Sequence, residues 1–214
     1  MKPCNAILLI GPTGAGKTPV GDCLERTGLW GRRCVHFDFG ANLRRIAQGG
    51  ACPSVLEEQD LAVVRRSLET GRLLEDRDFH IAARILRAFA EEKRVEDRDL
   101  IVLNGMPRHA GQARDVDAIA AVRAVVVLDC SAQVVAARIR SNVGGDRLGR
   151  ADDDPAAVAN KLRIFRERTL PLLDHYRQEG VYIATVKVGV ATTPEDVVRR
   201  LEERREQAER AVGM

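Results

Sequence analysis

The eight residues GPTGAGKT, Gly11 to Thr18, follow a short apolar run, Asn5 to Ile10, that is typical of a buried parallel strand. A helix is expected to begin near Lys17 and to end by Gly28, with Pro19 in its first turn, where a missing N–H costs little. Glycines let the backbone between these elements curl, so that successive N–H groups and the positive end of the helix surround an anion. The stretch therefore predicts a strand–loop–helix unit built to hold phosphate.

The same residues fit the Walker A pattern G-x-x-x-x-G-K-[ST] in full. The alternative is a glycine-rich turn without a ligand, but the position between a strand and a helix favours a nucleotide. Lys17 is then expected to reach the β and γ phosphates, and Thr18 to ligate Mg²⁺. The backbone of Gly14, Ala15 and Gly16 completes the expected binding loop. The predicted ligands are ATP and Mg²⁺.

The rest of the chain continues the alternation of strands and helices. Further strands are expected at 33–37, 99–104, 124–128 and 181–188, and helices at about 110–121, 129–141 and from 155 onward, with a bend at Pro171. The block 40–94 is strongly helical in composition. This pattern predicts an α/β fold of the P-loop NTPase type, with a five-stranded, mainly parallel sheet flanked by helices.

Composition limits the classes of function. The chain has 214 residues, 30% of them charged, and a net charge of +3, which favours neither a nucleic-acid partner nor a membrane-surface partner. The N-terminal apolar run is too short for a signal peptide, and no apolar run is long enough to span a membrane, so the cytoplasm is the expected compartment. A monomer is also expected. The five cysteines and four histidines are scattered and show no metal-ligand spacing.

Three further stretches give the chain a family resemblance. They are NGMPRHAGQ (104–112), GRADDD (149–154) and KLRIFRERTLPLLDHYRQEG (161–180). Together with the Walker A loop they resemble the adenylate kinases and their nucleoside monophosphate kinase relatives over nearly the whole chain. No Asn-Lys-x-Asp string of the GTPases occurs. The resemblance implies one P-loop kinase domain, 1–214, that transfers the γ-phosphoryl group of ATP.

The resemblance also implies an acceptor site. Arg108 matches the family arginine that binds the acceptor phosphate, and Gln112 matches the glutamine that reads the adenine of AMP. Arg44 lies on the position that grips the AMP phosphate, within a helical acceptor-binding insertion at 40–75. AMP is therefore the first expected acceptor.

A short lid is implied at 142–153. Arg150 matches the lid arginine that acts on the transferring phosphate, and Arg147 can substitute for another lid arginine. In the helix that follows, Lys161 stands where the family has a second catalytic arginine. The family's adenine-contacting backbone after the last strand corresponds to Gly189. Catalytic roles are thus implied for Lys17, Arg108, Arg150 and Lys161.

Two positions depart from the family pattern and keep other functions open. Asn104 stands where the family has an aspartate, whose negative charge favours Mg²⁺. We therefore expect weaker use of magnesium in this chain, and we expect Asn104→Asp to lower the magnesium requirement. Phe39 replaces a threonine of the acceptor site. The alternatives are a kinase for a different nucleotide or small-metabolite acceptor, and a nucleotide-binding regulator with little turnover.

Overall fold

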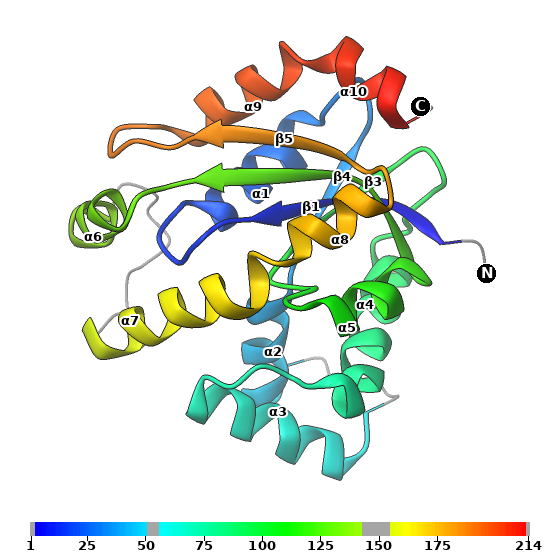
Figure 1. The fold of residues 1–214 in the computed structure, drawn as a ribbon. Coiled ribbons are helices and arrows are strands. Elements are labelled where there is room, and N and C mark those ends of the chain that lie inside the picture. The colour runs from blue at the N-terminus through cyan, green and yellow to red at the C-terminus, as the bar shows by residue number, and fades with distance from the viewer. Residues whose placement is uncertain (1–2, 51–55, 143–154, 213–214) are drawn as a thin grey trace.

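The computed structural model describes residues 3–50, 56–142 and 155–212. Its strands form one sheet in the order β2-β3-β1-β4-β5, and every neighbouring pair is parallel (Figure 1). The predicted α/β architecture is confirmed. The strands are β1 Cys4–Ile10, β2 Cys34–Asp38, β3 Leu100–Asn104, β4 Ala120–Asp129 and β5 Tyr182–Lys187.

Helices cover both faces of the sheet. One apolar cluster joins a face of the sheet to α1, α9 and α10, and a second joins the other face to α2, α4, α5 and α8. The bounds are α1 Lys17–Thr27, α2 Phe39–Ala47, α3 Glu58–Thr70, η1 Asp76–Asp78, α4 Phe79–Glu92, α5 Ala110–Asp117, α6 Ala132–Ser141, α7 Pro155–Ile164, η3 Phe165–Thr169, α8 Leu172–Gln178, α9 Pro194–Glu202 and α10 Arg205–Val212. None of the helices within these described residues is long and apolar enough to span a membrane.

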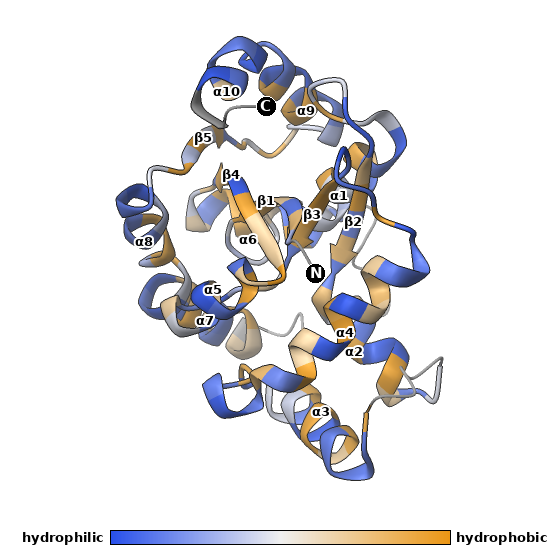
Figure 2. Ribbon diagram, turned by 90° about the vertical axis from the view of Figure 1, so that its right-hand side faces the viewer, coloured by the Kyte–Doolittle hydropathy of each residue, from blue (hydrophilic) through white to orange (hydrophobic). Residues whose placement is uncertain are grey.

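The central strand supplies both apolar clusters by simple alternation. Ile7 and Leu9 pack toward α1, whereas Ala6, Leu8 and Ile10 pack toward the other layer. All five side chains are at most 2% exposed, and Figure 2 shows the hydrophobic colour concentrated along the strands. A strand buried on both faces explains why Asn5 to Ile10 reads as an unbroken apolar run.

Two predicted boundaries are wrong at one place in the chain. The helix predicted for 110–121 ends at Asp117, and the strand predicted to begin at Ala124 begins at Ala120. The first residues of β4 pair with the start of β1, Cys4 with Ala120 and Ala6 with Val122. Alanines favour a helix locally, but here the hydrogen bonds of the parallel ladder determine the structure.

The long helix predicted from 155 is interrupted before Pro171, as the proline suggested. Helix α7 ends at Ile164, η3 follows as a π-helical turn, and α8 begins at Leu172. The N–H of Leu170 donates to the carbonyl of Phe165, five residues back, at 2.8 Å. Since proline has no N–H to continue the ladder, the chain leaves the α-helical register here.

Helices α2 and α3 lie at the bottom of Figure 1, and α2 follows directly from the end of β2. The carboxylate of Asp38 caps α2 by accepting a hydrogen bond from the N–H of Ala41 at 2.8 Å. A reciprocal capping box of Glu57 and Asp60 begins α3. This pair of helices includes most of the insertion predicted at 40–75, whereas the predicted lid lies almost entirely outside the described residues.

Candidate active site

The Walker A loop is held in shape by glycines and by its own lysine. Gly14 and Gly16 have positive φ angles of 78° and 96°, which glycine adopts without strain. Lys17 begins α1 as predicted, and its Nζ donates to the carbonyls of Gly11 and Pro12 at 2.7 and 2.9 Å. Ala15 is buried, and its N–H donates to Pro12 within the loop. The curled loop therefore has the shape that a phosphate chain requires.

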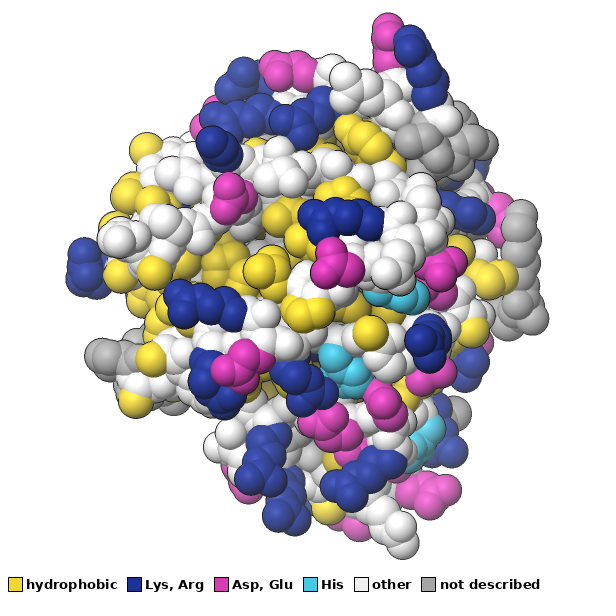
Figure 3. All heavy atoms as spheres, in the orientation of Figure 1, with side chains coloured by type: hydrophobic (Ala, Val, Ile, Leu, Met, Phe, Trp, Pro, Cys, Tyr) yellow, Lys and Arg dark blue, Asp and Glu magenta, His cyan; other side chains and the backbone are white. Residues whose placement is uncertain are grey.

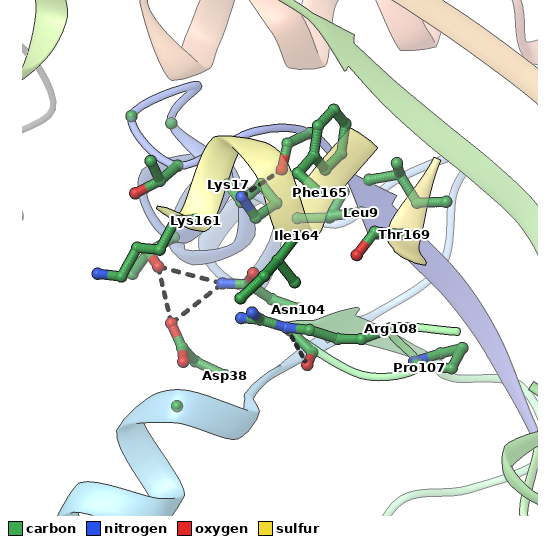
Figure 4. Close-up of a pocket in the computed structure, with 18 of the residues that line it drawn as sticks. Leu9, Lys17, Asp38, Asn104, Pro107, Arg108, Lys161, Ile164, Phe165 and Thr169 are labelled. Atoms are coloured by element: carbon green, nitrogen blue, oxygen red, sulfur yellow. Dashed lines mark hydrogen bonds between the residues drawn. The ribbon is translucent and has the colours of Figure 1, made fainter. Parts of the chain in front are cut away.

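One pocket opens at the carboxyl ends of β1, β2 and β3, which is where ligands bind in open parallel sheets (Figure 4). It brings together most of the predicted site residues from distant parts of the chain. Those lining it are Gly14, Gly16, Lys17, Thr18, Arg44, Arg108 and Lys161.

Arg108 is fixed at the floor of this pocket. Its Nε donates to the carbonyl of Gly105 at 3.0 Å, and Gly105 itself has a positive φ of 87°. Burial lowers the pKa of the Arg108 guanidinium, while the negative charge of Asp38 raises it. Figure 4 shows the guanidinium ending beside Asn104 and Asp38. A guanidinium held in this way is a fixed cation for an anionic ligand.

Three polar side chains meet beside the Walker A loop. The hydroxyl of Thr18 donates to Oδ2 of Asp38 at 2.7 Å, and Nδ2 of Asn104 donates to the same oxygen at 3.0 Å and to Oγ1 of Thr18 at 3.1 Å. Carboxylate and hydroxyl oxygens are ligands that Mg²⁺ prefers. This donor set therefore fits the magnesium ion that the Walker A loop implies.

Asp38 was missed at the sequence level. It lies in the stretch Phe37 to Arg45, which resembles the start of the family's acceptor-site helix, but only Arg44 and Phe39 were singled out there. Asp38 directly follows the strand predicted at 33–37. It contacts Thr18 because β2 pairs with β3 and β3 with β1, and this strand order could not be read from the sequence.

Gln112 does not line the pocket. Its side chain is 2% exposed, and both ends of its amide are already bonded within the protein. Oε1 accepts from the N–H of Arg108 at 2.9 Å, and Nε2 donates to the carbonyl of Leu74 at 2.6 Å. Here the amide ties the Arg108 loop to the segment before α4.

Gly189 also lies outside the pocket lining, but it is linked to the Walker A loop through Arg138. Nη1 of Arg138 donates to the carbonyls of Gly189, Val190 and Thr192 at 2.8 to 3.0 Å, and Nε donates to Gly14 at 3.2 Å. In the sequence, only its place in the helix predicted at 129–141 distinguished this arginine. Its guanidinium connects the loop after β5 to the loop after β1.

Arg147 and Arg150, and the predicted lid beyond Asn142, lie outside the residues that the structure describes. A second hollow lies between β4 and α7, lined by the apolar side chains of Val127, Leu162, Phe165 and Leu170 among others. Figure 3 shows hydrophobic side chains gathered on this face. None of the predicted site residues lines it.

Known proteins are similar to this chain in sequence and in fold. The AAA domain family model matches residues 7–158. An adenylate kinase of Prochlorococcus marinus (strain MIT 9313) is 31% identical over 180 residues, which are 82% of this chain and 86% of the relative. An adenylate kinase of Synechococcus sp. (strain WH7803) is 30% identical over 92% of this chain and 96% of the relative.

Among solved structures, a gluconokinase from Sinorhizobium meliloti 1021 is similar with a TM-score of 0.52 and 18% identity, over 97% of both chains. At this identity the likeness shows the fold alone. The sequence relatives extend over most of both chains, and the matched segment holds the Walker A loop and Arg108. The chain therefore belongs to the P-loop kinases of the adenylate kinase and nucleoside monophosphate kinase family.

Proposed function

We propose that this protein transfers the γ-phosphoryl group of ATP to a nucleoside monophosphate, with AMP as the acceptor. The observation that carries the proposal is that one pocket is lined by the Walker A lysine and by two arginines from separate segments, Arg44 and Arg108. A donor phosphate and an acceptor phosphate would each find cationic partners there. The relatives named adenylate kinase support the same acceptor.

The residues of the pocket suit phosphoryl transfer, which depends on positioning and charge neutralisation. Lys17 and Lys161 would hold the donor phosphates, and Arg44 and Arg108 would hold the acceptor phosphate. Magnesium, when bound, neutralises phosphate charge and orients the donor. A nucleotide phosphate is already anionic at neutral pH, so the transfer needs no general base. Arg147 and Arg150 are proposed to complete the site from the lid at 142–153.

Closure over the substrates is part of the proposal. The insertion at 40–75 carries Arg44, and the lid would carry Arg150, so movement of the two toward the Walker A loop would bring their charges to the phosphates. Closure would also exclude water, and in that way it would suppress hydrolysis of ATP.

A second candidate is a kinase for a different acceptor, and two observations favour it. Gln112 is 2% exposed and does not line the pocket, so reading an adenine would require its side chain to be uncovered. Phe39 is buried, with its ring 6.1 Å from that of Phe37, where the family has a hydroxyl side chain. Neither feature changes the phosphate-binding residues, so the two candidates differ only in the acceptor.

A panel of acceptors in a coupled assay of ADP formation separates the candidates. We expect AMP to be the best acceptor, and Arg108→Lys to lower kcat/KM for AMP by about 100-fold because a lysine lacks the planar fork of donors. Arg114→Lys, on the exposed side of α5, is the matched control. Turnover with AMP at a tenth or less of that with another acceptor would favour the second candidate.

A further inference from the structure

An acid and an amide stand opposite each other at the carboxyl ends of β2 and β3. Asp38 and Asn104 are paired in the parallel register of these strands. The family resemblance places the acid on the Asn104 strand. In this chain the negative charge lies one strand further from the Walker A loop, yet Oδ2 of Asp38 is still 2.7 Å from the hydroxyl oxygen of Thr18.

The contact with Asp38 prepares the Thr18 hydroxyl for a cation. A hydroxyl has one proton, and Thr18 donates it to Asp38. Its oxygen accepts one hydrogen bond from Nδ2 of Asn104 and keeps its other lone pair for a metal ion. The nearby carboxylate adds the negative charge that Mg²⁺ favours. Asp38 therefore supplies what Asn104 lacks.

The amide at 104 is explained by the same contacts. Its Nδ2 faces Oδ2 of Asp38 at 3.0 Å, and it also lies 3.4 Å from Nε2 of His36, whose Nδ1 is 2.8 Å from Oδ1 of Asp22. A carboxylate at position 104 would place two negative charges about 3 Å apart, which is costly without a cation. Asn104 instead donates to Asp38 and holds it beside Thr18.

We propose that Asp38 is the carboxylate that holds the magnesium ion of bound ATP, and that Asn104 is a neutral positioning residue. This inference rests on the proposed use of ATP, but not on the identity of the acceptor. It concerns the donor side of the pocket, which both candidate functions share.

The substitution that tests it is Asp38→Asn. Asparagine caps a helix as well as aspartate does, so the cap on the N–H of Ala41 is retained and α2 should still form. The measured quantity is the dissociation constant of a non-hydrolysable ATP analogue, by calorimetry, with magnesium and with a chelator. The ratio of the two constants reports how strongly the protein couples metal to nucleotide, without any turnover.

We expect Asp38→Asn to reduce this ratio by about tenfold or more, as loss of a metal-holding group does. Binding in the chelator should be unchanged or tighter, because a negative charge near the phosphates is removed. The double variant Asp38→Asn/Asn104→Asp returns the carboxylate to β3 and should restore most of the ratio. Asp129→Asn, a matched change at the end of β4 outside this pocket, should leave the ratio as in the wild type.

The inference is overturned if folded Asp38→Asn has the same ratio as the wild type, or if the ratio of the wild-type protein is itself near one. If Asp38→Asn alone fails to fold, the double variant decides. A ratio in the double variant equal to that of the wild type supports the inference, and a ratio near one contradicts it. Failure of every acceptor in the coupled assay would reject the proposed function while leaving the metal-coupling result intact. The two proposals can therefore fail separately.

Discussion

The guanidinium of Arg138 donates to four main-chain carbonyls and is 5% exposed. Lysine has no planar fork of donors, so Arg138→Lys cannot reproduce these bonds. We expect the variant to lose about 1–3 kcal/mol in free energy of unfolding, measured by urea denaturation. It should also bind the ATP analogue more weakly, because Gly14 is no longer tied to the loop after β5.

Arg140 lies on the same helix and is exposed, so Arg140→Lys is the control for this change. Its free energy of unfolding should stay within about 0.5 kcal/mol of the wild type. Equal effects of the two substitutions would show that the buried carbonyl contacts of Arg138 contribute little.

Gln112 leads to a second prediction at the scale of a residue. Gln112→Leu keeps the volume of the side chain but removes both amide partners, leaving the N–H of Arg108 and the carbonyl of Leu74 without them. We expect a loss of about 1–3 kcal/mol in the free energy of unfolding without any nucleotide, because buried polar groups lose their partners. An unchanged urea midpoint, together with a raised KM for AMP alone, would instead assign Gln112 to adenine recognition.

These residues show where sequence reasoning ends. Lys17, Thr18, Arg44 and Arg108 lie at positions that match the family's motifs, and all four line one pocket in the structure. Asp38 and Arg138 were given no role from the sequence. The contacts of Asp38 depend on the order of the strands, and those of Arg138 depend on the loop after β5. The sequence shows which residue types are present, whereas the fold determines which distant groups a given Asp or Arg contacts.

At the scale of elements, α3 and α4 are joined by one buried carboxylate. Asp60 contacts Nε2 of His80 and Nη1 of Arg84, each at 2.9 Å, and also accepts from the N–H of Glu57. Burial raises the pKa of Asp60, but the Glu57 N–H, His80 and Arg84 together lower it below its ordinary value. The ionised carboxylate therefore stabilises the packing of α4 against α3.

The pKa of Asp60 is lower in the folded state than in the unfolded state, and this determines how stability changes with pH. The stabilisation by Asp60 is complete above the unfolded pKa, near 3.8, and is lost as the pH falls through the folded value. We expect Asp60→Asn to be less stable than the wild type by about 1–3 kcal/mol at pH 7, and this difference to shrink below pH 4. Urea unfolding at a series of pH values measures it, with exposed Asp115→Asn as the control. A difference that is constant from pH 7 to pH 3 would contradict the assignment.

The elements themselves were largely predictable, because a buried parallel strand and an amphipathic helix each leave a clear pattern. The errors fall where long-range pairing overrides local preference, as at Ala120, which belongs to β4 because it pairs with Cys4. The sequence predicted a bend of the helix at Pro171, but not that the turn before it would be a π-helix. The spacing of apolar residues indicates a helix, but it does not distinguish an α-helical from a π-helical hydrogen bond within it.

At the scale of the whole molecule, a sheet covered on both faces carries the helix pair α2 and α3, and α3 buries only Asp60 and Val64. An exposed ion pair links the segment between α3 and η1 to the π-helical turn, with Oε2 of Glu75 3.0 Å from Nη2 of Arg168. Such a pair contributes at most about 1 kcal/mol. This ion pair alone therefore holds η3 only weakly to the segment that follows α3.

A bisubstrate ligand tests the two sides of the pocket together. If both sides accept adenine nucleotides, two adenosines joined by five phosphates should raise Tm more than adenosine pentaphosphate at the same concentration, because the second adenosine binds without a further loss of translational freedom. At about 100 times its Kd the ligand should stabilise the fold by about 2.7 kcal/mol, or roughly 5–11 °C in Tm for a chain of this size. Equal shifts for the two ligands would show that the acceptor side does not recognise adenosine, and so would favour an acceptor of another class.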